Sequence, residues 1–177
     1  MEYSLLGWPS DGPTLSLDHE HFAYAGKFVI PRTGKAVARE DGVVVAAAAF
    51  DADRTDDDCL RIRYVTVRDD RRDEGIGSRL LRFVVDRAHD RGYDEVKAGV
   101  NNPLAYEAFY RAGLAYTGET TGLAELVCST ASTRTRERYQ AGLGAFRERD
   151  LTDSLRSFLD ACEDCDPPPV VDSPAES

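Results

Sequence analysis

The alternation of apolar and polar residues is clearest from Leu60 to Val67, where an apolar side chain occupies nearly every second position. Such a period of two is typical of a half-buried strand. From Gly77 to Arg91 the period changes to that of a helix, with an apolar stripe opposite a charged face. The apolar stripe consists of Leu80, Leu81, Val84, Val85 and Ala88. The pattern therefore predicts a strand followed by an amphipathic helix that ends at Gly92.

Further strands are predicted on both sides of this pair. Lys35–Arg39 and Val43–Phe50 flank Glu40-Asp41-Gly42, a hairpin signal between two β-prone runs. A helix begins at Pro103, which suits a first helical position, and ends near Gly113. The remaining strand-like runs are Tyr3–Trp8, Glu95–Val100, Leu114–Thr117 and Ala124–Cys128. Strands and helices alternate in the middle with hairpins at both ends, which predicts an α/β (α+β) domain with a mixed sheet covered by helices.

The C-terminal part of the chain has a different pattern. Two helical stripes of apolar residues run from Tyr139 to Phe146 and from Leu151 to Cys162. Beyond Cys165 the chain is acidic and rich in proline, and is expected to be disordered. We therefore expect a domain over residues 1–130, a helical extension over 131–165 and a tail over 166–177. The stripes are expected to pack on their own domain, with a homodimer contact as the alternative, so the chain is expected to be a monomer or a homodimer.

Composition narrows the classes of partner. The 177 residues carry a net charge of −10, and the 22 basic residues include only three Lys. This acidic balance argues against a nucleic-acid partner. The acidity is halophile-like, because carboxylates keep a protein hydrated and soluble at high salt. The alternative role of the acidity is to steer cationic amine substrates to the protein. No apolar run approaches the roughly 20 residues of a membrane span, and no secretory signal opens the chain, so a cytoplasmic location is expected.

The four cysteines do not predict a metal site. Only Cys162 and Cys165 form a close pair, and a single C-x-x-C lacks the second ligand pair of a zinc site. We expect these thiols to be incidental and the protein to need no metal.

The loop between the predicted strand and helix carries the most informative motif, R-x-x-G-x-G. Gly75 and Gly77 let backbone amides approach an anion, and the start of a helix offers unpaired N–H groups. Two other phosphate motifs do not fit. A dinucleotide loop needs a third glycine where Leu80 stands, and a nucleoside triphosphate loop needs a lysine that is missing here.

This segment resembles the acetyl-coenzyme A signature of the GCN5-related N-acetyltransferase (GNAT) superfamily. Val65-Thr66-Val67 before it and Ser78-Arg79-Leu80-Leu81 after it match as well. The segment 101–114 resembles the family's second coenzyme-binding region. The resemblance implies a mostly antiparallel sheet of about six to seven strands, acetyl-CoA as cosubstrate, and direct transfer of its acetyl group to an amine. A non-catalytic module that binds or senses acyl-CoA on the same fold is the alternative.

The resemblance also implies site residues. Backbone groups of Val65 and Val67 are expected to bind the pantetheine arm and the thioester, with Val67 N–H at the oxyanion, and Asn102 or its neighbour Asn101 to bind the arm. The amides expected to bind pyrophosphate belong to Arg72, Asp73, Glu74, Gly75, Ile76, Gly77 and Ser78.

A tyrosine hydroxyl is expected to protonate the leaving thiolate. Tyr110 is preferred and Tyr106, four residues earlier on the same helix face, is the second candidate, while the family's usual spacing places Phe109 at the tyrosine position. The general base is not identified among Glu40, Asp58, His19 and His21. Tyr24 and Lys27 lie where the family forms its acceptor pocket.

Overall fold

The computed structural model describes residues 1–177 and contains one seven-stranded sheet of order β1-β2-β3-β4-β5-β7-β6. Only β4 and β5 pair in parallel, and every other neighbouring pair is antiparallel. The strands are β1 (Glu2–Gly7), β2 (Gly34–Glu40), β3 (Val43–Ala52), β4 (Cys59–Val67), β5 (Glu95–Val100), β6 (Ala115–Thr120) and β7 (Leu126–Ser129). This confirms the predicted mixed, mostly antiparallel sheet.

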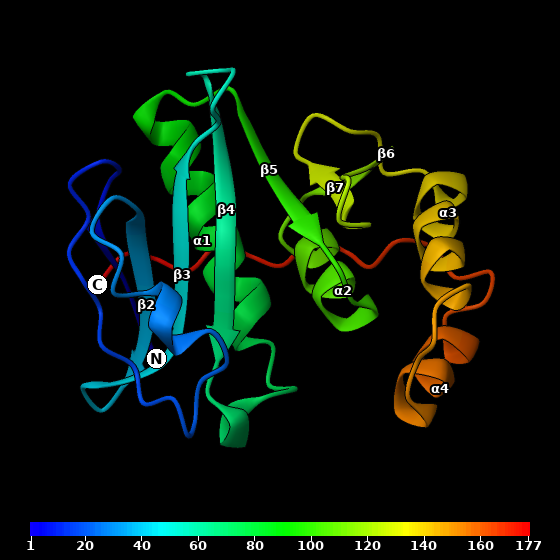
Figure 1. Ribbon diagram of the computed structural model, residues 1–177, viewed down its shortest axis with the longest axis horizontal. Helices are drawn as coiled ribbons and strands as arrows, with labels where there is room; N and C mark the ends of the chain where they lie inside the picture. The colour runs from blue at the N-terminus through cyan, green and yellow to red at the C-terminus, as the bar shows by residue number, and fades with distance from the viewer.

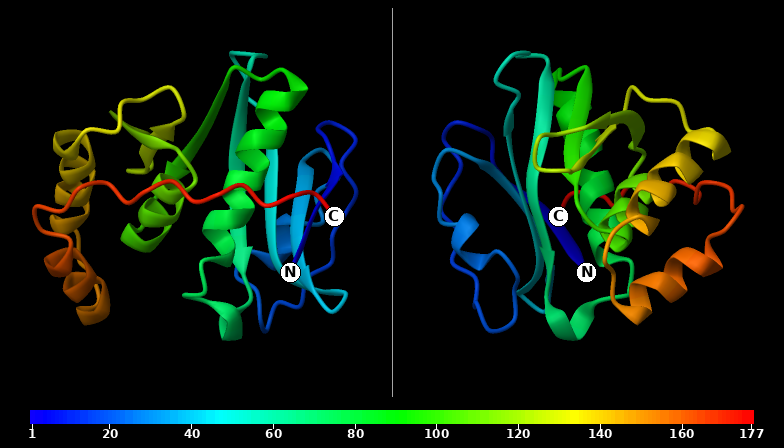
Figure 2. Two further views of the ribbon diagram at one scale, coloured as in Figure 1. Left: turned by 180° about the vertical axis from the view of Figure 1, so that it is seen from behind. Right: turned by 45° about the vertical axis from the view of Figure 1, so that its right-hand side comes forward.

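The two faces of the sheet are covered differently. Helices α1 (Ile76–Arg91) and α2 (Pro103–Arg111) lie behind the sheet in Figure 1. On the opposite face, the irregular segment 8–33 packs over the β1–β4 part of the sheet, as the right-hand view of Figure 2 shows, and its only helical turn is η1 (Ala25–Lys27). A second short turn, η2 (Asp69–Arg71), follows β4. The sheet therefore has a regular helical face and a loop-covered face.

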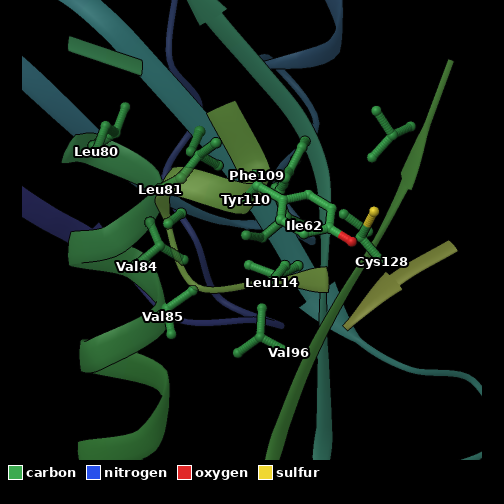
Figure 3. Close-up of a cluster of buried hydrophobic side chains, with 14 of the residues drawn as sticks. Ile62, Leu80, Leu81, Val84, Val85, Val96, Phe109, Tyr110, Leu114 and Cys128 are labelled. Carbon is green, nitrogen blue, oxygen red and sulfur yellow. The ribbon is translucent and has the colours of Figure 1, made fainter. Parts of the chain in front are cut away.

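Helix α1 buries the predicted apolar stripe against the sheet. Leu80, Leu81, Val84 and Ala88 are fully buried, and Val85 is 1% exposed. Figure 3 shows the stripe residues Leu81, Val84 and Val85 on the side of α1 that faces Ile62 and Val96 from β4 and β5. The helix ends at Gly92, which adopts a left-handed φ of 109° that favours glycine. Burial of the four Leu and Val side chains stabilises the domain by roughly 1.5–3 kcal/mol each.

Helices α3 (Arg136–Arg147) and α4 (Asp153–Ala161) form the C-terminal extension beyond β6. Thr135 and Thr152 cap them, each accepting a hydrogen bond from the first-turn amide three residues on. The stripe residues Tyr139, Leu143 and Phe146 are buried within the chain's own core, as is Leu159. Both helices therefore cover their apolar faces on the domain that carries them.

The last residues lie extended across α1 and α2 and end beside β1 (Figure 2). Arg134 Nη2 donates to the Pro168 carbonyl at 2.7 Å, Val171 N to Arg111 O at 2.8 Å, and Ser177 N to Tyr3 O at 2.8 Å. This arrangement differs from the disorder expected of 166–177. Composition underestimates the order because the partners of the segment are backbone groups of distant elements.

Candidate functional site

A gap between β4 and β5 creates a cavity. The two strands pair only from Cys59–Ile62 to Glu95–Ala98 and then diverge, as Figure 1 shows. A cavity of about 160 Å³ occupies the gap, lined on the β4 side by Arg63, Tyr64 and Val65. The other side is lined by residues 99–102, and Phe109 of α2 contributes an aromatic wall. The cavity is comparable in size to one that holds a benzene-sized ligand.

Backbone groups of β4 face this gap. In the ladder with β3, Arg68 N donates to Val45 O, and the register pairs Val67 with Ala46 and Val65 with Ala48. Because hydrogen-bonded and non-hydrogen-bonded pairs alternate in an antiparallel ladder, Val65 and Val67 direct their N–H and C=O groups away from β3. The pairing with β5 has already ended, so these groups remain available to a ligand.

The glycine loop closes the α1 end of the site. Asp73 and Gly75 adopt left-handed φ values of 64° and 74°, and Gly75 caps α1 without a side-chain hydrogen bond. The first-turn amides therefore lack partners within the helix and from a capping side chain. A Cβ on Gly77 would lie 3.2 Å from Val67 Cγ2, so glycine allows the loop to pack on the end of β4. Free amides at the start of a helix are typical of anion-binding sites.

Charged side chains fix the shape of this loop. Arg71 Nη2 lies 2.9 Å from Glu74 Oε2, and the same guanidinium pairs with Glu40. The Arg71 hydrogen bonds hold the pKa of both carboxyl groups below its ordinary value. Arg79 donates to the Glu74 carbonyl at 3.1 Å and to the Tyr3 hydroxyl at 3.2 Å. Arg72 is exposed and makes no ion pair, so its charge is available to an incoming anion.

The other loop residues have different positions. Ile76 is buried at 1% exposure in the core, and Ser78 is 6% exposed inside the first turn of α1. Their side chains support the fold, and only their backbone amides remain for a ligand. Asn102 lines the cavity and also caps α2, accepting from Ala105 N at 2.9 Å. Its Nδ2 group lies 3.4 Å from Asn101 Oδ1.

The structure does not bring the two tyrosine hydroxyls of α2 into the cavity. Tyr110 and Tyr106 are both fully buried. The Tyr110 hydroxyl accepts a hydrogen bond from Tyr116 N at 3.0 Å, and the Tyr106 hydroxyl donates to Tyr139 O at 3.0 Å. Figure 3 shows the Tyr110 hydroxyl pointing to Cys128 within the core. This differs from the expected role of proton donor, because packing of β6 and α3 on α2 engages both phenols.

Burial also opposes ionisation of these phenols, since it raises the pKa of Tyr106 and of Tyr110. Phe109 lines the cavity instead. The residue at the family's usual spacing thus has no hydroxyl.

None of the four candidate bases lines the cavity. His21 Nδ1 lies 3.3 Å from Asp69, Glu40 pairs with Arg71, and His19 and Asp58 lie exposed on loops. Sequence reasoning missed Tyr64 and Glu125, which do line it. Their proximity depends on the strand gap and on the β6–β7 hairpin, and the only available signal was the position of Tyr64 directly before Val65.

No helix of the structure combines the length and apolar content needed to cross a membrane. No group of three or more His, Cys, Asp or Glu residues is arranged to hold a metal ion.

Comparison with solved structures identifies the same fold elsewhere. The Bacillus subtilis acetyltransferase in complex with CoA matches with a TM-score of 0.56 and 12% identity, covering 75% of this chain and 99% of that one. The protein yncA of Salmonella typhimurium with acetyl-CoA matches with a TM-score of 0.50 and 20% identity, covering 57% and 66%. These similarities concern the fold alone.

The chain spans 66% of an N-acetyltransferase from Staphylococcus aureus Mu50, just under two thirds of its length, at 20% identity and a TM-score of 0.49. A search of curated proteins finds no match. The family model described as "Acetyltransferase (GNAT) family" matches residues 3–114, which include the glycine loop, both splayed strands and α2. The chain therefore belongs to the GNAT acetyltransferase family.

Proposed function

We propose that the protein is an N-acetyltransferase that moves an acetyl group from acetyl-CoA to an amine by direct transfer. The observation that carries the proposal is the gap between β4 and β5. It places unpaired backbone groups of Val65 and Val67 beside a glycine loop whose amides are free. In the coenzyme the thioester-bearing pantetheine arm is attached to a pyrophosphate, and the gap and the loop fit these two parts in that order.

The residues that would hold the coenzyme fit its chemistry. Amides of residues 72–78 at the start of α1 would bind the pyrophosphate, with Arg72 adding positive charge. Val65 and Asn102, on opposite sides of the cavity, would bind the pantetheine arm. Metal ligands are not part of this proposal.

When bound, acetyl-CoA supplies a thioester carbonyl as acyl donor. Val67 N–H would donate to the carbonyl oxygen as negative charge develops there, which is where a fixed donor accelerates acyl transfer most. The amine must lose its proton before it attacks. No cysteine lines the cavity, and no covalent enzyme intermediate is required.

The leaving thiolate also gains from a proton donor at the cavity. Tyr64 is the candidate closest in sequence to the backbone groups just described, and it lines the cavity. We favour Tyr64 as the proton donor over Tyr106 and Tyr110, because the hydroxyls of those two residues already form hydrogen bonds with backbone groups of the protein.

A non-catalytic acyl-CoA binding module is the second candidate function. One observation favours it: Phe109 stands in the cavity where the family's usual spacing places a tyrosine. Both candidates share the coenzyme site and differ only in chemistry.

Two measurements test the proposal in sequence. Calorimetric titration with acetyl-CoA tests binding, and release of free thiol in the presence of an amine panel tests transfer. Acetyl-CoA binding together with thiol release and an acetylated amine detected by mass supports the enzyme. Tight binding with no transfer to any amine supports the binding module, and absence of binding contradicts both.

A further inference from the structure

One carboxylate in the cavity has no partner. Glu125 lines the cavity from the turn before β7 and takes part in none of the ion pairs of the protein. Its side-chain oxygens accept no hydrogen bond from another residue, whereas its backbone is fixed to Thr121 by two hydrogen bonds of 2.8 and 3.2 Å. The Glu125 carboxylate is thus held at the cavity with both of its oxygens free to accept hydrogen bonds from a ligand.

Gly99 makes room for this carboxylate. A Cβ at position 99 would lie 3.1 Å from Glu125 Oε2 and 3.2 Å from Oε1, closer than nine in ten real Cβ contacts. A Cβ at this point of β5 would require the carboxylate to move by a few tenths of an ångström. The strand therefore accommodates the negative charge directly beside the gap.

The C-terminal extension holds the turn that carries Glu125. Arg149, which follows α3, donates through Nη1 to Asn101 O at 3.3 Å and through Nη2 to Ala124 O. One guanidinium thus joins the end of β5 to the residue before Glu125. Ala124 adopts a left-handed φ of 62°, which is unfavourable for a residue with a side chain and needs support from its surroundings.

The rest of the cavity suits a cation. Tyr24 and Tyr64 line it with ring centroids 5.7 Å apart, and aromatic faces attract cations. Arg63, the one basic residue in the lining, is neutralised by Asp51 at 2.5 Å. The Lys27 ammonium lies over the Tyr64 ring, 5.8 Å from its centroid, so one face of that ring already contacts a cation of the protein; Lys27 is not part of the lining. Glu125 is therefore the one uncompensated charge of the cavity wall.

We propose that Glu125, beside Gly99 at the paired end of the cavity, binds the ammonium group of the acceptor, while the pantetheine arm lies between Val65 and Asn102. Glu125 then selects a compact aliphatic primary amine that has no carboxylate on the carbon bearing the nitrogen. This rests on the proposed function and specifies its substrate class. Repulsion between Glu125 and a neighbouring carboxylate disfavours α-amino acids. Glu125 is thus a specificity-determining residue, and Arg149 positions it.

Three ligands with the same four-carbon chain test this selection by equilibrium binding to the CoA-loaded protein. Butylamine carries the charge, butanol replaces the ammonium with a neutral group, and norvaline is butylamine with a carboxylate beside the nitrogen. NMR titration is expected to show butylamine binding at least about tenfold more tightly than either, equivalent to about 1.4 kcal/mol. Equal binding of butylamine and butanol, or tighter binding of norvaline, would overturn the proposal.

Glu125→Gln removes the charge and keeps the shape. It is expected to lower butylamine affinity about tenfold and to leave butanol and acetyl-CoA affinities unchanged. Glu119→Gln, on an exposed position of β6, is the matched control and should change none of the three. Unchanged butylamine binding in Glu125→Gln contradicts the assignment.

The readout separates this inference from the proposed function. Loss of acetyl-CoA affinity in Glu125→Gln would indicate that the carboxylate contacts the coenzyme. That result would overturn the inference and would not contradict the proposed acetyltransferase function. Selective amine binding without acetyl transfer would support the inference and contradict the proposed function.

Discussion

The Tyr110 hydroxyl accepts a hydrogen bond from the Tyr116 amide at 3.0 Å, which joins α2 to the start of β6. Both residues are buried, so no water molecule can replace the Tyr110 hydroxyl as the acceptor for this amide. The phenol on the helix face expected to serve catalysis therefore satisfies a backbone donor.

Tyr110→Phe is expected to lower the free energy of unfolding by about 1–3 kcal/mol, because it leaves the Tyr116 amide buried and unsatisfied. Turnover per folded molecule should change little. Urea unfolding together with thiol release measures both quantities. Tyr116→Phe is the control, because the Tyr116 hydroxyl makes no side-chain hydrogen bond. Full stability with lost turnover would restore Tyr110 as the proton donor.

Gly77→Glu is expected to reduce acetyl-CoA affinity at least about 100-fold, or about 2.7 kcal/mol. The new side chain meets Val67, and its negative charge lies at the anion site. Gly144→Glu adds the same charge to α3, where nothing lies within 4 Å, and should leave affinity unchanged. Calorimetric titration compares the two, and equal affinities would remove the glycine loop from the coenzyme site.

Gly142→Ala is expected to destabilise the fold by about 1–3 kcal/mol, because overpacking forces neighbours apart. A Cβ at position 142 would lie 2.0 Å from the Tyr106 hydroxyl oxygen. Gly144→Ala, two residues later in the same helix, meets open space and should stabilise by about 0.5–1 kcal/mol. The urea midpoint is expected to fall in Gly142→Ala and to rise in Gly144→Ala, relative to the unsubstituted protein. Similar shifts in the two variants would mean that α3 does not pack on Tyr106 in this way.

Arg149→Ala is expected to raise the KM for the amine about fivefold or more, while kcat and acetyl-CoA affinity change little. The reason is that Arg149 joins the Glu125 turn to Asn101, and its loss frees the carboxylate to move. Arg136→Ala removes an exposed arginine that pairs with Asp166 and serves as the control. A general loss of stability without a change in KM would indicate a purely structural role.

Deletion of residues 133–177 is expected to promote aggregation, because it uncovers Tyr106 and the adjoining core that α3 buries. Light scattering measures the effect. Phe158→Glu in the full chain tests the homodimer alternative, since a dimer that becomes monomeric supports an interface through α4. A long truncation that stays soluble, monomeric and active would contradict both expectations.

The local pattern was sufficient for much of the fold. The alternation from Leu60 to Val67 and the stripe on α1 specified their elements, because each depends on the period of one segment. The glycine loop was equally readable, since Gly75 and Gly77 affect backbone geometry at their own positions. The resemblance to the GNAT family followed from these segments and was confirmed by the family match.

Only the tertiary structure decided which side chains reach the cavity. Tyr106 and Tyr110 share a helix face, but the packing of β6 and α3 determines that this face is buried and that Phe109 faces the gap. Glu125 and Gly99 are 26 positions apart in sequence (125 − 99) and meet because β7 pairs with β5. A sequence pattern reports periods along one segment, whereas contacts between segments depend on how the segments pack. That is why the glycine loop was predictable and the lining of the cavity was not.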